Sequence, residues 1–339
     1  MTTGPSPSPR NITSVDLGDA DLNARISSGM ADVEALLEST LTRGEPFIVE
    51  KVAHLAKAGG KRFRPMMALL ASQYGTAPGC ERVVKAAVIV EVVHLATLYH
   101  DDVMDEADKR RGVESANSRW GNSVAILAGD ILLAHASRLM SQLDTRTVGH
   151  FADTFEELVT GQMRETVGES AGLSAVEHYM QVIREKTGVL IASAGYLGAL
   201  HGGADEEIVD ALYHLGGVIG VIFQIVDDMI DIFSATDDSG KTPGTDLREG
   251  VFTLPVLYAL EEEGEVGDEL RALLTGPLTD DAEVDRALEL LRRSTGRACT
   301  MQVVQGLLDE AESYISRLPA GPATDALRAL SKYTIHRVG

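Results

Sequence analysis

The sequence predicts an all-α protein, a single large helical bundle around a central cavity. Apolar residues recur at helical spacing along most of the chain, whereas alternating runs typical of strands are rare and aromatic residues make up only 5% of it. Proline and glycine concentrate between the periodic segments, at Gly75 to Gly79, at Gly202 and Gly203, and in the polar loop from Thr236 to Gly250. No change in composition marks a domain boundary.

The periodic segments define the expected elements in order. We expect helices at residues 18–42, 46–57, 61–74, 80–106, 122–143, 146–168, 174–201, 205–235, 252–263, 267–274, 281–296, 298–316 and 322–334. Residues 1–15 begin with a stretch rich in Ser, Thr and Pro, and we predict that they form a disordered tail. Residues 16–339 then form one predicted domain.

Composition limits the possible partners. Of the 339 residues, 30 are Lys or Arg and 51 are Asp or Glu, so the formal charge is −21. Such a charge argues against nucleic acid or an anionic membrane as a general partner, and it makes local clusters of cations informative. Two isolated cysteines, Cys80 and Cys299, fit a reducing, cytoplasmic location. No run of 18 uninterrupted apolar residues occurs, so we expect no stable membrane insertion.

One aspartate pattern occurs twice. Asp101-Asp102-Val103-Met104-Asp105 and Asp227-Asp228-Met229-Ile230-Asp231 each follow a mainly apolar, helix-compatible run. Residues i and i+4 share a face of a helix, so the first and last aspartates of each motif project together. Carboxylates gathered in this way repel one another unless a cation binds them, and Mg²⁺ prefers such oxygen ligands together with substrate phosphates.

A single motif of this kind is more often a solvated face. Two of them, each introduced by a core-like apolar segment, favour a cavity instead. Two such faces opposed across a cavity would hold Mg²⁺ ions around a diphosphate.

Basic residues provide the other half of the predicted site. Lys61 and Arg64 are three residues apart at the start of a predicted helix, where backbone N–H groups and the helix dipole favour anions. Arg110 and Arg111 directly follow the first aspartate motif. Each group alone could be an ordinary surface patch or turn, but cations beside carboxylates suit an anion held by metal and arginine together.

Further candidates lie on the same predicted faces. His94 precedes Asp101 by two helical turns, and a phosphate contact is favoured over a plain core role. Lys186 and Thr187 lie in an apolar helix, where the lysine either reaches a polar cavity or extends to the surface. Gln224 shares a face with Asp227. Lys241 and Asp246 lie in the glycine-rich loop, which could close over a diphosphate, although solvent exposure is the simpler reading for the lysine.

Taken together, these motifs resemble those of the trans-isoprenyl diphosphate synthases, or trans-prenyltransferases. The matching features, in the family's order, are Gly60 to Pro65, His94, the first aspartate motif with Arg110 and Arg111, Gly129-Asp130, Gly161-Gln162, Lys186-Thr187, Phe223-Gln224 and the second aspartate motif. The resemblance spans about residues 20 to 335 and is closest to long-chain members that make quinone side chains.

The resemblance implies an all-α fold of the isoprenoid synthase type, usually a homodimer. It implies that Asp101, Asp105, Asp227 and Asp231 bind Mg²⁺, with Asp102 and Asp228 in support. Lys61, Arg64, His94 and Arg111 would bind isopentenyl diphosphate, and Arg110, Lys186, Thr187, Gln224 and Lys241 would bind the allylic diphosphate. Many members carry a lysine near Gly250, where this chain has Val251-Phe252, so that contact is not carried over.

The implied reaction needs no nucleophile. Mg²⁺ and cations would stabilise the departing diphosphate, and the double bond of isopentenyl diphosphate would attack the allylic carbon. Three alternatives stay open: a short-chain farnesyl or geranylgeranyl diphosphate synthase, a terpene cyclase, and a regulatory subunit of a heteromeric prenyl synthase. A cyclase would leave Lys61, Arg64 and His94 unexplained, and a regulatory subunit is expected to lose an aspartate motif.

Small residues before the first motif bear on product length. Ala96 and Thr97 lie five and four residues before Asp101, with Val93 and Ile89 further along the helix. In the resembling family, short-chain synthases commonly place a bulky aromatic at one of the first two positions. Its absence here predicts a long product, heptaprenyl to decaprenyl diphosphate. The alternative is that Ala96 is only a tight contact between helices.

Overall fold

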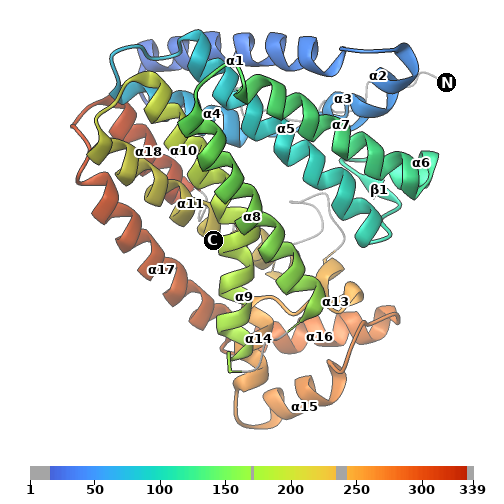
Figure 1. Cartoon of the computed structure of the whole chain (residues 1–339). Helices are drawn as coiled ribbons and strands as arrows, with labels where there is room; N and C mark the ends of the chain where they lie inside the picture. Colours follow the sequence, from blue (N-terminus) through green and yellow to red (C-terminus); the bar gives the residue numbers. More distant parts are fainter. Residues whose placement is uncertain (1–15, 169–171, 234–242, 334–339) are drawn as a thin grey trace, which may run out of the picture. The chain divides into compact units, whose positions relative to one another are not determined.

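The computed structural model describes residues 16–168, 172–233 and 243–333, and helices dominate all three stretches (Figure 1). The only strands in these stretches are β1, Lys109–Arg110, and β2, Val113–Glu114, which pair as a short antiparallel hairpin. The all-α class is therefore confirmed. The predicted tail, residues 1–15, lies outside the described residues, as does Lys241.

The chain divides into two compact units. Unit 1 contains residues 1–153, 193–213 and 319–326, and unit 2 contains residues 154–192, 214–318 and 327–339. Four of the five divisions fall inside helices, namely α8 (Thr145–Val167), α10 (Val189–Gly202), α11 (Glu206–Phe233) and α18 (Pro322–Tyr333), and the fifth lies between residues 318 and 319, before α18. The single predicted domain from residue 16 onward stays a prediction.

Unit 1 is built around one buried helix, α5. Its other complete elements are α1 (Ala20–Leu41), α2 (Pro46–Val52), α3 (His54–Lys57), α4 (Phe63–Ala71), the short 3₁₀ helix η2 (Ser72–Tyr74), α6 (Ala116–Trp120), α7 (Asn122–Met140) and the hairpin. α5 (Glu81–Met104) packs against α1, α4 and above all α7. A helix that is surrounded in this way must be apolar on every side, which explains the long apolar run before Asp101.

Close helix contacts in unit 1 rely on glycine. A Cβ atom on Gly198 of α10 would lie 2.1 Å from the backbone oxygen of Ala68 in α4. A Cβ atom on Gly129 of α7 would lie 2.3 Å from Nε2 of His100, the residue before the first aspartate motif. Larger residues at these two positions would force the helices apart, so glycine sets how α4 and α5 sit beside their neighbours.

Unit 2 contains α9 (Ala175–Ile183), α13 (Thr245–Glu249), α14 (Leu254–Glu261), α15 (Glu265–Leu273), α16 (Asp281–Arg293) and α17 (Gly296–Ile315). α9 begins at a capping box, in which Ser174 and Glu177 satisfy each other's backbone N–H groups. A π-helical segment, η3 (Arg184–Gly188), joins α9 to α10. Glycine again permits a close crossing, since a Cβ atom on Gly220 of α11 would lie 2.8 Å from Cα of Gly188.

The predicted helices are present, with differences at their breaks. The expected helix 46–57 is divided at Ala53, and the expected helix 61–74 begins at Phe63 and ends in 3₁₀ geometry. The expected helix 174–201 is interrupted by η3. Neither α6, α13 nor the hairpin was expected. All three are short, and their turn-forming residues carry too little periodic signal to predict an element.

Among the residues that the structure describes, three helices, α5, α7 and α11, are long and apolar enough to cross a membrane by length and composition alone. The share of the apolar window that is buried inside the structure is 72% for α5, 39% for α7 and 61% for α11. Packing within the protein therefore accounts for much of this apolar surface in α5 and α11. The absence of stable membrane insertion stays a prediction.

A buried histidine makes unit 1 sensitive to acid. His201 is 5% exposed, and its Nδ1 accepts a hydrogen bond from Nε of Arg82 at 3.3 Å. The hydroxyl of Thr147 donates to Asp144, so it accepts from Nε2 of His201 at 2.8 Å. This arrangement requires a neutral imidazole. Burial, followed by the charge of Arg82, lowers the pKa of His201 to about 4.

We therefore expect acid to reduce the free energy of unfolding. The unfolded chain binds a proton at His201 below the ordinary pKa of about 6.5, whereas the folded chain does so only near 4, so stability falls as the pH drops through this window. The loss is on the order of 3 kcal/mol. Urea unfolding at pH 7 and pH 4.5 measures it. His201→Gln, which keeps a donor for Thr147, should show a smaller loss; an equal loss would contradict the assignment.

Candidate active site

The first aspartate motif ends α5. Asp101 lies in the last helical turn, and Asp105 caps the helix, its N–H donating to the backbone oxygen of Asp101 at 2.8 Å. Asp101 is half-buried and Asp105 is exposed. The C-terminal end of a helix carries partial negative charge, so carboxylates there are unfavourable unless a cation is present. The motif therefore sits where cation binding would stabilise both the side chains and the helix end.

Asp102 differs from its neighbours because it is fully buried. Its Oδ1 accepts a hydrogen bond from Nε of Arg110 in β1 at 2.6 Å, while its Oδ2 is buried with no hydrogen-bond partner in the described structure. Burial raises the pKa of this carboxyl, and the Arg110 guanidinium opposes the rise. Arg110, which the sequence assigned to the allylic diphosphate, is thus paired with a carboxylate of the motif.

The hairpin positions the next arginine. Arg111 and Gly112 have φ of 54° and 78°, as a two-residue turn with two left-handed positions requires. Nη1 of Arg111 donates to the backbone oxygens of Leu55, at 3.1 Å, and Gly59. A Cβ atom on Gly60 would lie 2.9 Å from this nitrogen. Glycine at position 60 therefore lets the arginine approach the backbone closely.

A buried ion pair stands beside this turn. Arg62, in the left-handed region with φ of 51°, precedes the first residue of α4. Its Nη1 contacts Glu91 at 2.9 Å and its Nε contacts Glu34 at 2.6 Å. The Glu91 side chain is 2% exposed and that of Arg62 is 10% exposed. Burial lowers the pKa of Arg62, but these two carboxylates outweigh it and raise the pKa overall.

Positive charge exceeds negative charge around Glu91. Burial lowers the pKa of Arg64 to about 10; Glu91 opposes this fall and Arg111 adds to it. Nε of Arg64 is buried without a hydrogen-bond partner in the described residues. The pKa of His94 lies well below its ordinary value because of burial first and the charge of Arg64 next. The structure therefore brings Arg64, His94 and Arg111 together, as the sequence predicted, in a place that favours a bound anion.

Lys61 is exposed immediately before this cluster. The cluster lies within unit 1, together with the first motif.

The second motif lies near the end of α11 in unit 2. Asp227 is half-buried, and Asp228 and Asp231 are each 6% exposed. Asp228 accepts hydrogen bonds on both oxygens: from Nε2 of Gln224 at 2.8 Å, and from the hydroxyl of Tyr179 in α9. Burial raises the pKa of Asp228 to about 7, against the effect of both hydrogen bonds.

Asp231 anchors the segment that follows α11. Its two carboxylate oxygens accept the N–H groups of Thr245, at 3.3 Å, and Asp246, at 3.2 Å. Its backbone oxygen accepts from the N–H of Gly244 at 2.9 Å. Asp246 therefore approaches the second motif through its backbone. The predicted closure of this loop stays a prediction, because Lys241 lies outside the described residues.

Charged partners surround the π-helical segment. Lys186 pairs with Glu165, and Arg164 contacts Glu185 at 3.0 Å. The hydroxyl of Thr187 donates to Oε1 of Gln224 at 3.1 Å, so two predicted substrate residues bind each other. A Cβ atom on Gly161 would lie 2.7 Å from Cβ of Glu185, which explains the glycine in α8. Lys186 is paired in this structure, and its predicted diphosphate contact requires exchange of that partner.

The four residues proposed to set product length all lie on α5. Ala96 and Val93 are each 1% exposed and Ile89 is fully buried. Thr97 is half-buried, and its hydroxyl donates to the backbone oxygen of His94 at 2.9 Å. The small side chain of Ala96 therefore lies in the interior of unit 1, and that of Thr97 lies at a partly exposed position.

No three His, Cys, Asp or Glu side chains in the described ranges are grouped so as to hold a metal ion. The assignment of Asp101, Asp105, Asp227 and Asp231 as metal ligands stays a prediction.

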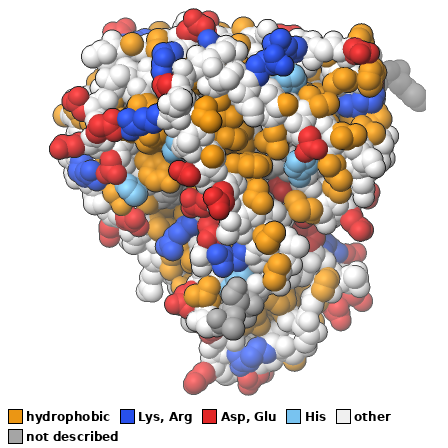
Figure 2. Space-filling view, viewed as in Figure 1, with side chains coloured by type: hydrophobic (Ala, Val, Ile, Leu, Met, Phe, Trp, Pro, Cys, Tyr) orange, Lys and Arg blue, Asp and Glu red, His pale blue; other side chains and the backbone are white. Residues whose placement is uncertain are grey.

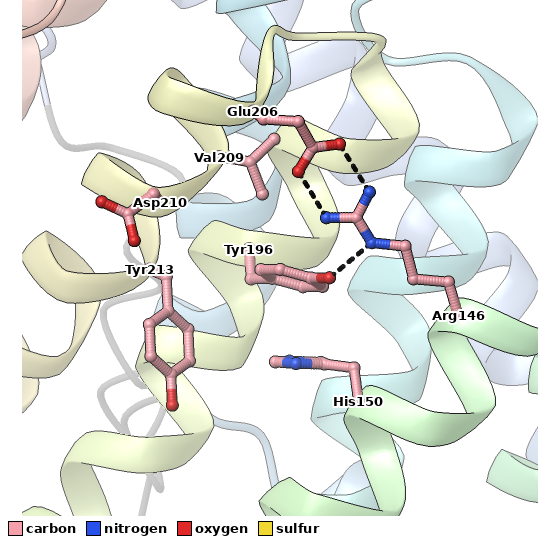
Figure 3. Close-up of a pocket in the computed structure, with 7 residues that line it drawn as sticks. All are labelled: Arg146, His150, Tyr196, Glu206, Val209, Asp210 and Tyr213. Atoms are coloured by element: carbon pink, nitrogen blue, oxygen red, sulfur yellow. Dashed lines mark hydrogen bonds and ion pairs between the residues drawn. The ribbon is translucent and has the colours of Figure 1, made fainter.

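Unit 1 also contains a pocket of about 290 Å³ that none of the sequence motifs indicated (Figure 3). Arg146 forms two hydrogen bonds with Glu206 and a third with the hydroxyl of Tyr196. The rings of His150 and Tyr196 stack with centroids 3.9 Å apart, and Tyr213 meets both edge-on. These contacts link α8, α10 and α11, so the charged residues serve the packing of these helices.

Comparisons with known proteins agree with this geometry. A family model described as polyprenyl synthetase matches residues 45–291. A nonaprenyl diphosphate synthase of Mycobacterium tuberculosis is 52% identical over 97% of this chain and 98% of its own. A solved geranylgeranyl pyrophosphate synthase from Corynebacterium glutamicum, complexed with calcium and isoprenyl diphosphate, has 62% identity and a TM-score of 0.88, covering 96% of this chain and 100% of that one.

A decaprenyl diphosphate synthase from Rhodobacter capsulatus has a TM-score of 0.84 at 33% identity, covering 94% of this chain and 99% of that one. The chain therefore belongs to the polyprenyl synthetase family. It is a prenyltransferase, and the resemblance drawn from its motifs is confirmed.

Three residues of the site were not predicted. Glu91 is a lone acid in an apolar helix, one turn before His94, and this signal could have identified it. Tyr179 lies two helical turns before Lys186, and Arg62 lies between two residues that were selected. Neither has a sequence signal of its own, because the role of each depends on a distant partner: Asp228 for Tyr179, and Glu91 for Arg62.

We expect Glu91→Gln to destabilise the protein by about 3 kcal/mol, because it leaves buried guanidinium groups without their nearest buried carboxylate. Added inorganic diphosphate should raise the melting temperature of this variant more than that of the wild type. Glu34→Gln is the matched control, since Glu34 binds the same arginine but is 47% exposed, and its loss should be small. Similar losses in the two variants would contradict the charge imbalance.

Proposed function

We propose that this protein condenses isopentenyl diphosphate with an allylic prenyl diphosphate in a Mg²⁺-dependent reaction. The product is a long-chain all-trans polyprenyl diphosphate, of the kind used for quinone side chains. The observation that carries the proposal is the cation cluster in unit 1. Arg62, Arg64 and Arg111 lie near Glu91 and give more positive than negative charge, next to an aspartate motif and to the neutral His94. A substrate that carries a diphosphate would supply the missing negative charge.

The donor atoms fit the implied metal. Both motifs offer carboxylate oxygens at the C-terminal end of a helix, and Oδ2 of Asp102 is buried without a hydrogen-bond partner among the described residues. Hard cations such as Mg²⁺ prefer these ligands. Asp101, Asp105, Asp227 and Asp231 would hold Mg²⁺, whose charge would stabilise the departing diphosphate. The related synthase from C. glutamicum was solved with calcium and isoprenyl diphosphate, which supports a divalent cation.

The roles proposed for the side chains are those that the family resemblance implies. Lys61, Arg64, His94 and Arg111 bind the diphosphate of isopentenyl diphosphate and orient its double bond. Arg110, Lys186, Thr187, Gln224 and Lys241 are proposed for the allylic diphosphate. The bond between the allylic carbon and oxygen breaks, the double bond attacks that carbon, and the released diphosphate can accept the proton lost from the adduct. The chain supplies charge and orientation rather than a nucleophile.

Two further parts of the proposal rest on surface features. In unit 1, α7 exposes Ile126 and Leu127, and α8 exposes Val148. Figure 2 shows hydrophobic side chains on the visible surface of the protein. Apolar surface of this kind supports a homodimer.

Cys80 and Cys299 are both free thiols, which supports a cytoplasmic location.

An assay with purified protein, both diphosphates and Mg²⁺ tests the proposal. We expect elongated prenyl diphosphate, whereas a cyclic hydrocarbon would indicate a cyclase, and no turnover would indicate a regulatory subunit. Asp101→Ala and Asp227→Ala should abolish turnover and leave a folded chain, because they remove repelling carboxylates together with the metal ligands. Near-normal kcat with Mg²⁺ in either variant would refute the metal assignment.

We also expect the two diphosphate substrates to be bound by separate groups of residues. Lys61→Ala and Arg64→Ala should raise KM for isopentenyl diphosphate about ten- to a hundred-fold, the effect of losing one charge-assisted hydrogen bond. KM for the allylic substrate should change much less. Lys57→Ala, an exposed lysine of the same unit, is the control. If both KM values rise equally, the two diphosphates are not bound by separate groups of residues.

A geranylgeranyl product is the second candidate, because the C. glutamicum relative carries that name at 62% identity. The M. tuberculosis relative is named for a nonaprenyl product. The absence of an aromatic residue at positions 96 and 97 favours the longer product.

Ala96→Phe should shorten the product, since a ring at this buried position would close the space available to the growing chain. The substitution should also cost about 1–3 kcal/mol through overpacking. Thr97→Phe, at a half-buried position, should shorten the product with a smaller loss of stability. Ala87→Phe overpacks a different face of α5 and serves as the control. Chromatography of the dephosphorylated products measures chain length; unchanged products from folded, active variants would contradict the assignment.

A further inference from the structure

We propose that Tyr179 is a positioning residue for the second aspartate motif. Its hydroxyl holds the carboxylate of Asp228 and thereby sets the orientation in which Asp227 and Asp231 meet a divalent cation bound to diphosphate. This inference rests on the proposed function, and it assigns a role to α9, which the sequence motifs leave without one.

Both oxygens of Asp228 are engaged by the protein. Tyr179 donates to Oδ2 from α9, and Gln224 donates to Oδ1 from one turn earlier on α11. Asp228 is 6% exposed, so water does not compete freely for these oxygens. Each of these hydrogen bonds would have to break before the Asp228 carboxylate could turn away from its two donors. The two side-chain donors therefore fix the orientation of Asp228 within the motif.

Two hydrogen bonds in unit 2 connect Thr187 to Asp228 through the side chain of Gln224. The hydroxyl of Thr187 donates to Oε1 of Gln224, which fixes the orientation of the Gln224 amide. Nε2 of the same amide then donates to Asp228. The chain Thr187 to Gln224 to Asp228 joins the π-helical segment to α11, and Tyr179 closes it from α9. A residue predicted to contact the allylic diphosphate is thus connected to the aspartate motif through a single amide.

The surroundings of Tyr179 suit this task. Burial, then the negative charge of Asp228, raise the pKa of the phenol well above its ordinary value, so the hydroxyl keeps the proton that it donates. Asp228 and Asp231 lie three residues apart on α11, on neighbouring positions of one face. Asp231 is itself held by two N–H groups at the start of α13. Tyr179 and the start of α13 therefore hold the end of α11 at two neighbouring aspartates of one face.

Tyr179→Phe tests the proposal because it removes only the hydroxyl and keeps the ring. The titration uses Mg²⁺ with inorganic diphosphate and follows the melting temperature, a readout that does not depend on turnover. We expect the midpoint Mg²⁺ concentration to rise about tenfold or more, in keeping with one lost charge-assisted hydrogen bond, and kcat to fall in parallel. Tyr314→Phe is the control, since its hydroxyl makes no hydrogen bond to the described residues and its ring stacks on His214.

A double-mutant cycle separates positioning from a structural role. Asn at position 228 cannot accept from Tyr179 and Gln224 with both side-chain atoms, so Asp228→Asn and Tyr179→Phe should be strongly non-additive in the Mg²⁺ midpoint. A lower melting temperature of Tyr179→Phe without any change in the midpoint would assign the hydroxyl to stability alone and overturn the proposal. An unchanged midpoint and kcat would overturn it as well.

The assay of wild-type protein keeps the two proposals apart. If the wild type elongates prenyl diphosphate but Tyr179→Phe has an unchanged Mg²⁺ midpoint and kcat, only the role proposed for Tyr179 is refuted. A wild type that gives no elongated product removes the proposed function, whereas the Mg²⁺ and diphosphate titration still reports on Tyr179.

Discussion

The arrangement around the first aspartate motif depends on one buried carboxylate that several cations share. Glu91 is almost fully buried within α5, and its charge lowers the electrostatic cost of burying Arg62, Arg64 and Arg111 nearby, while Glu34 is a second partner of Arg62. Two carboxylates cannot neutralise three guanidinium groups. In a chain of formal charge −21, this local excess of positive charge stands against the overall field, and it persists because the backbone is shaped around it. The left-handed Arg62 and the Arg111-Gly112 turn are parts of that shape.

The two aspartate motifs have the same sequence pattern but different supports. Asp102 is held by a guanidinium group, whereas Asp228 is held by a phenol and an amide. A guanidinium group offsets the charge of a carboxylate, whereas neutral donors do not, and burial raises the pKa of Asp228 to about 7. The two motifs therefore differ in the charge of the group that supports the middle aspartate. Identical spacing in the sequence does not imply identical electrostatics, and metal affinity can differ between the motifs for that reason.

Much of the fold could be predicted from the sequence, because long amphipathic or fully apolar segments bounded by glycine and proline have a strong periodic signal. The basic residues proposed to bind the anion could also be predicted, since Lys61, Arg64, His94 and Arg111 stand out as basic side chains in apolar or acidic surroundings. The ion pairs were not. Arg110 pairs with Asp102 and Lys186 pairs with Glu165, and nothing in the sequence indicates either partner; their assignment to the allylic diphosphate stays a prediction. Such choices depend on side-chain distances across the fold, which periodicity does not contain.

The π-helical segment η3 has a consequence for how this part of the chain tolerates changes in length. A π turn contains one residue more than an α turn, so it resembles an α-helix that has accepted a single insertion. Removing one residue between Arg184 and Gly188 would restore continuous α-helical geometry, and the flanking helices could keep their packing. The orientation of the side chains in this segment would change, because Lys186 and Thr187 would no longer both face their present partners. A one-residue deletion here would thus alter the chemistry of the segment while leaving its architecture intact.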